Sequence, residues 1–254
     1  MMSFNVKKTS KASLTLFLVL CLVALSSCSA GVSNNAPIQE NVRTQNSAQA
    51  ADTGGTGAVE TAGRAFTDDP EAMDAAAASV VKLDTYSKNG DRIATGSGFC
   101  AFDSSVLVTA AHVTANMAYM TATRDDGSTF RIDRLIDGSK DKDIALCALP
   151  DDAGLTPLAV SSEEALRGEK IAVIGSQFGV VNLVTLGNIC ARWESGGTHW
   201  LLFTAPVSGG SSGGPLINSK GLAVGIVSAT YENGQNLNVA APIAEAEKIY
   251  KSIR

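Results

Sequence analysis

The sequence carries the stretch Gly209-Gly210-Ser211-Ser212-Gly213-Gly214-Pro215 near its C-terminal end. Dense glycine lets a backbone bend sharply and lets a substrate carbonyl approach without obstruction by Cβ atoms. Such a bend can direct the backbone N–H groups of Gly210 and Ser212 to one point, which predicts an oxyanion hole beside a nucleophilic Ser212. Taken alone, the stretch is equally compatible with a flexible glycine-serine loop. A nucleophile at Ser212 therefore needs a base and a carboxylate elsewhere in the chain.

The base must be a histidine, and the chain has only two, His112 and His199. His112 lies in Val108-Thr109-Ala110-Ala111-His112-Val113, where small residues follow a β-type run and place an imidazole at a strand end. His199 precedes Trp200 at the start of another run, and we interpret it as a surface or turn residue. Because a serine nucleophile is activated by an adjacent imidazole, His112 is the candidate base.

The candidate carboxylate is Asp143, which opens the apolar run Asp143-Ile144-Ala145-Leu146. A carboxylate in this position can be partly buried and face an imidazole, where it fixes the tautomer and stabilises the imidazolium. A strand-end cap is the alternative interpretation of Asp143. The nucleophile elbow of α/β-hydrolases is excluded for Ser212, since that fold places its histidine after the serine.

Together these motifs resemble the chymotrypsin-like serine proteases, which show T-A-A-H, then D-[IL]-A-L, then G-x-S-G-G-P. The resemblance covers roughly residues 75–254 and is closest to the bacterial Deg-type and glutamyl-endopeptidase branches. It implies a triad of His112, Asp143 and Ser212, an oxyanion hole from Gly210 and Ser212, and an acyl-enzyme mechanism without metal or organic cofactor. Ser211 stands where the digestive enzymes carry an aspartate, which implies that their zymogen switch is missing.

The arrangement of the chain agrees with an all-β fold. Short β-type runs alternate with turn signals such as Asn89-Gly90 and Asp126-Gly127, which is typical of sandwiches and barrels. With the resemblance, we expect two six-stranded antiparallel β-barrels and a C-terminal α-helix in one domain, residues 73–254. The N-terminal barrel should cover about 75–150, the C-terminal barrel about 165–241, and the helix 242–254.

The resemblance also places the substrate pocket at the segment before the nucleophile and at the strand after it. It implies that the pocket is lined by Pro206, Val207, Val227, Ser228, Ala229 and Thr230. This set contains no acid for Lys or Arg, and no histidine at Val227, where glutamyl endopeptidases keep theirs. We therefore expect cleavage after small or medium apolar residues, with weak discrimination among them.

The N-terminus has the pattern of a bacterial leader. Lys7, Lys8 and Lys11 precede the apolar run 14–25, which is short for a membrane span. Small residues then lead into Cys28, which resembles a lipobox. We expect a lipoprotein signal peptide at 1–27, lipidation of Cys28, and a disordered tether at 28–72 that anchors an extracytoplasmic enzyme to the membrane of the cell envelope. An ordinary signal peptide, or a pro-segment in place of the tether, is the alternative.

The composition of the chain limits the classes of partner that we expect it to bind. A formal net charge of −5 and a pI near 5.1 argue against nucleic-acid binding. The sequence contains no C-x-x-C spacing that would suggest a zinc site. The disulfide pairing of Cys100, Cys147 and Cys190 stays open. The expected partners are protein or peptide substrates, and the oligomeric state is not specified. A catalytically silent lipoprotein module and an esterase on the same fold are the competing functions.

Overall fold

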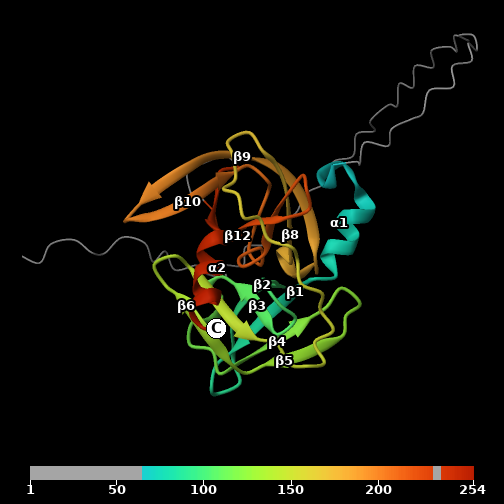
Figure 1. Cartoon of the computed structure of the whole chain (residues 1–254). Helices are drawn as coiled ribbons and strands as arrows, with labels where there is room; N and C mark the ends of the chain where they lie inside the picture. Colours follow the sequence, from blue (N-terminus) through green and yellow to red (C-terminus); the bar gives the residue numbers. More distant parts are fainter. Residues whose placement is uncertain (1–64, 231–235) are drawn as a thin grey trace, which may run out of the picture. The chain divides into compact units, whose positions relative to one another are not determined.

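The computed structural model describes residues 65–230 and 236–254, drawn in colour in Figure 1. The chain divides into two units, Met1–Gly57 and Ala58–Arg254, and every described residue belongs to the second. The predicted signal peptide, Cys28 and most of the predicted tether lie outside the described residues. Within the described part, no helix has the length and apolar character needed to cross a membrane.

The first half of the domain is a seven-stranded antiparallel sheet in the order β5-β4-β1-β2-β3-β7-β6, coloured from blue-green to yellow in Figure 1. Its strands are β1 (Val80–Tyr86), β2 (Arg92–Cys100), β3 (Val106–Thr109), β4 (Tyr119–Thr123), β5 (Thr129–Ile132), β6 (Leu135–Ser139) and β7 (Ile144–Ala148). The structure differs from the expected six-stranded barrel because residues 129–136, which form one β-type run in the sequence, break at Asp133-Arg134 into two strands. These two strands, β5 and β6, lie at opposite edges of the sheet, which curves as an open half-barrel.

The second half is a closed six-stranded barrel in the order β10-β13-β12-β11-β8-β9, which confirms the predicted architecture. Its strands are β8 (Lys170–Gly175), β9 (Leu183–Ser195), β10 (Thr198–Phe203), β11 (Pro215–Asn218), β12 (Ala223–Thr230) and β13 (Asn238–Pro242). β9 and β10 form a hairpin that turns through Gly196 and Gly197, both of which have positive φ. The order of the strands leaves the segment between β10 and β11, which contains Ser212, at one end of the barrel.

Helical segments are short: η1 (Phe66–Asp68), α1 (Pro70–Ala77), η2 (Ala111–Thr114), η3 (Gln177–Gly179) and α2 (Ile243–Ser252). η1 and α1 begin before residue 72, where the tether was expected to end. The Asp69 side chain accepts hydrogen bonds from the N–H groups of Glu71 and Ala72, and Pro70 occupies the first helical position. Phe66 is buried, so ordered structure begins before residue 73, the expected start of the domain.

Three apolar clusters hold the domain together. One fills the half-barrel, one fills the closed barrel, and the third joins the two sheets through residues such as Phe99, Ile144, Ile174 and Ile226. The predicted C-terminal helix is present as α2, and it contributes Ile243 and Ala246 to the joining cluster. Because α2 follows the second barrel and packs on strands of both sheets, it helps to fix one sheet against the other.

The three described cysteines are free. Cys100 on β2 and Cys147 on β7 both pair with Leu107, which lies on the strand between them. A disulfide needs Cα atoms within about 7 Å on a suitable vector, and two residues separated by a whole strand do not meet that condition. These thiols therefore serve as small apolar side chains of the half-barrel core.

Candidate active site

Three strand ends bring the predicted catalytic residues together. His112 lies in η2 directly after β3, and Asp143 immediately precedes β7, the neighbour of β3 in the half-barrel. Ser212 lies in the segment between β10 and β11 of the closed barrel. The half-barrel thus supplies the imidazole and the carboxylate, and the closed barrel supplies the hydroxyl.

Asp143 holds His112 at two points. Its Oδ1 accepts the backbone N–H of His112 at 2.9 Å, and its Oδ2 lies 2.8 Å from His112 Nδ1. Asp143 adopts a positive φ of 52°, which aspartate tolerates better than most residues. A carboxylate facing Nδ1 favours the tautomer with its proton on that atom, which leaves Nε2 as the basic nitrogen. The carboxylate side chain is 15% exposed and the imidazole 50%, so the base can be reached from solvent.

Ser228 makes a third contact with this carboxylate, donating its hydroxyl to Asp143 Oδ2 at 2.6 Å. We expected Ser228 in the substrate pocket. Its side chain reaches Asp143 because the β12–β13 register shifts between Val227 and Ala229, so Ser228 is the additional residue of a β-bulge. A bulge redirects a side chain relative to the regular alternation of a strand. The sequence signals the strand, but no turn residue marks the bulge.

The segment that carries Ser212 is a tight turn. The N–H of Ser211 donates to Ser208 O at 3.0 Å, and Gly210 has a φ of 103°. A positive φ at the third residue of a turn is the signature of type II and favours glycine. A Cβ at Gly210 would also lie 2.1 Å from Ser176 O, and one at Gly213 would lie 2.2 Å from Ser97 O. Both glycines are therefore required by backbone conformation and by steric contact.

The turn sets the direction of the Gly210 N–H. The carbonyl of Gly209 accepts a hydrogen bond from the N–H of Phe178 in η3 at 3.1 Å. Because a trans peptide points its C=O and N–H in opposite directions, the Gly210 N–H faces away from η3. Gly210 lies two residues before Ser212. Its N–H, directed in this way, is the kind of donor that an oxyanion hole needs.

The Ser212 hydroxyl is close to a neighbouring backbone oxygen. Its Oγ lies 3.5 Å from the carbonyl oxygen of Ser228, at the outer limit of a hydrogen bond. Among the described side chains, His112 and Ser212 share no hydrogen bond. In substrate-free enzymes such bonds are often long and tighten when substrate binds.

Comparison with known proteins decides the family. Residues 96–226, just over half of the chain, match the model of the trypsin-like peptidase domain. The chain belongs to this family. The match includes all three candidate catalytic residues, and it begins at Gly96 in β2.

Two similar proteins and one solved structure indicate the branch of the family to which this trypsin-like peptidase is similar. It is 32% identical over 165 residues to the anti-sigma-I factor RsgI9 of Acetivibrio thermocellus, covering 65% of this chain and 23% of that protein. It is 36% identical over 143 residues to serine protease HTRA1 of Xenopus laevis, covering 52% and 31%. The structure of the HtrA-type protease AlgW with a tripeptide superposes with a TM-score of 0.64 at 26% identity, covering 72% of this chain and 62% of that one. The chain spans less than a third of the length of each of these two relatives. The resemblance to the Deg-type branch is confirmed.

The predicted pocket residues of the peptidase divide into two groups. Pro206, Ala229 and Thr230 are exposed and Val207 is half-buried, so these four are accessible from solvent. We expected Val227 to line the pocket. It is only 2% exposed and belongs to the core of the closed barrel, so it does not line an accessible surface. Val227 pairs with Ala240, another residue of that core, and the register shift follows it at Ser228.

Sequence reasoning missed Asn238. It pairs with Thr230 across β12 and β13, and its Nδ2 donates to Ala205 O at 2.8 Å. The side chain therefore ties the segment before Pro206 to the strand that ends at Thr230, and these are the two expected walls of the pocket. The sequence gives no sign of this link, because Ala205 and Asn238 lie 33 residues apart.

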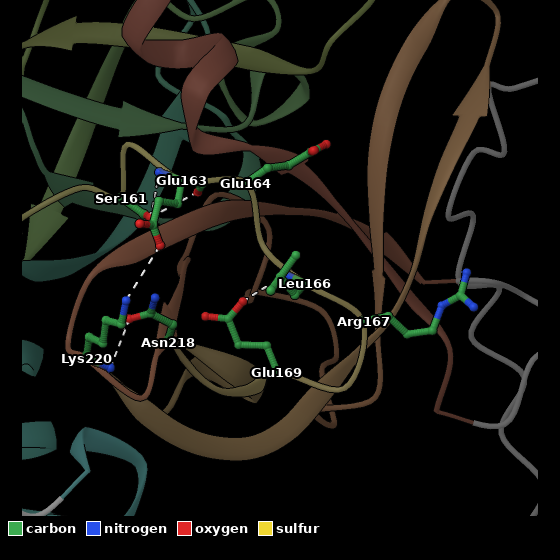
Figure 2. Close-up of a pocket in the computed structure, with 8 residues that line it drawn as sticks. All are labelled: Ser161, Glu163, Glu164, Leu166, Arg167, Glu169, Asn218 and Lys220. Atoms are coloured by element: carbon green, nitrogen blue, oxygen red, sulfur yellow. Dashed lines mark hydrogen bonds and ion pairs between the residues drawn. The ribbon is translucent and has the colours of Figure 1, made fainter.

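A separate cavity of about 550 Å³ lies on the closed barrel and contains none of the candidate site residues. Figure 2 shows its charged lining, with Lys220 paired to Glu163 and the Leu166 N–H bound to Glu169. Arg167 extends away from the other labelled side chains. Because Glu163, Glu169 and Lys220 are already engaged in these contacts, this cavity gives no reason to place the chemistry there.

Proposed function

We propose that the chain is a serine endopeptidase that works through an acyl-enzyme. Ser212 Oγ attacks the scissile carbonyl while His112 Nε2 accepts its proton, and the imidazolium then protonates the leaving amine. Water attacks the resulting ester with His112 again as base, which releases the acid and regenerates Ser212. The observation that carries this proposal is that Asp143 binds both the backbone N–H and the imidazole of His112.

The N–H groups of Gly210 and Ser212 serve as the oxyanion hole. The type II turn at Gly210 supports this role, since it points the Gly210 N–H away from η3. Such donors stabilise charge that develops only in the transition state, and losing one typically costs about 2.7–4 kcal/mol. This chemistry requires no metal or organic cofactor.

The substrates that we propose are extracytoplasmic proteins and peptides, cut after small or medium apolar residues. The exposed pocket positions Pro206, Ala229 and Thr230 carry no charge, which supports apolar selectivity. The leader pattern and Cys28 support export and lipid anchoring in the cell envelope. A cleavage profile from a peptide library dominated by Lys, Arg or Glu would contradict the apolar preference. Loss of radiolabelled palmitate from a Cys28→Ser variant would test the anchor.

The catalytic proposal is tested by labelling the protein with a fluorophosphonate probe. We expect labelling of the wild type and none of Ser212→Ala. His112→Ala should lose labelling as well, whereas His199→Ala, which removes an exposed imidazole on β10, should retain it. A denatured protein mixture, with new termini mapped by mass spectrometry, then separates an endopeptidase from an esterase. Absence of Ser212-dependent labelling would favour a catalytically silent module.

A further inference from the structure

Ser97 on β2 binds the segment that carries Gly210 and Ser212, strand β3 and the end of β8. Its backbone N–H donates to Ser212 O at 2.7 Å, and its carbonyl accepts the Thr109 hydroxyl at 2.7 Å. Its own hydroxyl donates to Gly210 O at 2.7 Å and accepts from the N–H of Ser176 at 2.8 Å. Ser97 is 0% exposed, so all of these bonds are shielded from water.

Two of these acceptors belong to the residues that supply the proposed oxyanion hole. Ser97 binds the carbonyl oxygen of Gly210 through its hydroxyl and that of Ser212 through its backbone. Rotation of either residue away from its present orientation would break a buried hydrogen bond. A buried polar group left without a partner is costly, so these bonds oppose such rotation.

Steric contact closes the other side of the turn. A Cβ at Gly210 would lie 2.1 Å from Ser176 O, so the Gly210 backbone packs directly on the end of β8. The Ser97 hydroxyl bridges the same two segments, because it binds Gly210 on one side and Ser176 on the other. The serine hydroxyl is therefore a polar link between the half-barrel, the end of β8 and the turn at Gly210.

We propose that Ser97 is a positioning residue that pre-organises the oxyanion hole. The inference rests on the proposed function, and it adds a residue on β2 to the site. Ser97 acts through Gly210 and Ser212 rather than on the substrate. Its removal should therefore weaken transition-state binding and lower kcat, while KM changes little.

The experiment compares Ser97→Ala with a matched control, Ser161→Ala. Ser161 is also buried, and its hydroxyl likewise donates to a carbonyl and accepts from an N–H, here both of Glu163. Ser161 lines the separate cavity in Figure 2 rather than the site. The probes are a peptide aldehyde ending in valinal, which adds Ser212 Oγ to form a hemiacetal in the oxyanion hole, and the corresponding peptide alcohol, which cannot form this adduct.

We expect Ser97→Ala to lower kcat and the affinity for the aldehyde by about tenfold or more, since loss of a whole oxyanion donor costs roughly 10²–10³ in kcat. The affinity for the alcohol and the KM should change less than about twofold, and Ser97→Thr should retain most of the activity because it keeps the hydroxyl. Ser161→Ala should resemble the wild type in all four measurements. If Ser97→Ala does not fold, Ser97→Cys carries the same expectation, because a thiol is a weak donor of similar size.

Unchanged aldehyde affinity in the folded Ser97 variant would overturn the inference. Equal losses for aldehyde and alcohol, or an equal aldehyde loss in Ser161→Ala, would also overturn it, since both would indicate a general structural effect. Failure of the proposed function has a different signature. In that case the wild type and Ser212→Ala would bind the aldehyde equally, whatever residue stands at position 97.

Discussion

The hydroxyl of Ser228 and the imidazole of His112 meet the same atom, Oδ2 of Asp143, at 2.6 Å and 2.8 Å. Ser228 comes from the closed barrel and the other two residues from the half-barrel. This oxygen therefore connects the two halves of the site. Its two contacts hold the carboxylate in line with His112 Nδ1.

Ser228→Ala should lower kcat/KM by about tenfold. A hydrogen bond to a charged group contributes roughly 1.5–3 kcal/mol, and about 1.4 kcal/mol is a factor of ten in rate. Steady-state hydrolysis of a peptide substrate measures the change, with Ser161→Ala as the control for a lost buried hydroxyl. Activity equal to the wild type would show that His112 and its backbone contact alone orient Asp143.

Gly213→Ala should destabilise the domain and abolish fluorophosphonate labelling. A Cβ at Gly213 would lie 2.2 Å from both Ser97 O and the Thr109 hydroxyl oxygen, and the φ of 86° is strained for alanine. Gly127→Ala is the matched control, since Gly127 has a φ of 80° and no atom lies within 4 Å of the position that a Cβ would take there. The control should lose only the conformational cost, about 1–2 kcal/mol. Thermal unfolding of both variants measures the difference, and equal losses would show that contact at Gly213 is unimportant.

Strand runs and turn signals predict most of the closed barrel, because each of its strands is a separate apolar run. The half-barrel is less predictable, since the run 129–136 gives no sign that Asp133 sends the chain to the opposite edge of the sheet. The site shows the same division. His112 and Asp143 sit beside strand ends that the sequence marks, whereas the orientation of Ser228 depends on a bulge, and the contacts of Ser97 depend on long-range packing.

Cys100 and Cys147 should resist thiol reagents in the native protein. Burial raises the pKa of the Cys100 thiol to about 12, with a further contribution from the nearby charge of Asp103, and burial alone raises the pKa of Cys147 to about 12. The reactive thiolate is therefore scarce at neutral pH. Alkylation followed by peptide mapping should modify both cysteines only after unfolding, and half-buried Cys190 should react before them. Rapid native labelling of Cys147 would contradict the packing of β7.

The stability of the domain should fall in acid partly through Glu245 on α2. Burial raises the pKa of this carboxyl, but hydrogen bonds from Lys142 and Lys248 outweigh burial and hold the pKa below its ordinary value of 4.5. A carboxyl with a lowered folded-state pKa contributes stability above its unfolded-state pKa and loses it as pH falls through the folded-state pKa. Lys142 adjoins Asp143, so the same ion pair fastens α2 beside the candidate catalytic carboxylate.

Glu245→Gln should therefore be less stable than the wild type at pH 7, and the difference should shrink as pH falls below about 4.5, the range in which this carboxyl titrates. Urea unfolding at about pH 7, 5 and 4 measures the free energy of unfolding of both proteins across that range. Glu247→Gln is the matched control, because Glu247 lies on the same helix and pairs with Lys251 one turn away, where exposed pairs contribute about 0.3–0.5 kcal/mol. A difference for Glu245→Gln that stays constant from neutral pH into acid would show that its ionisation does not contribute to stability.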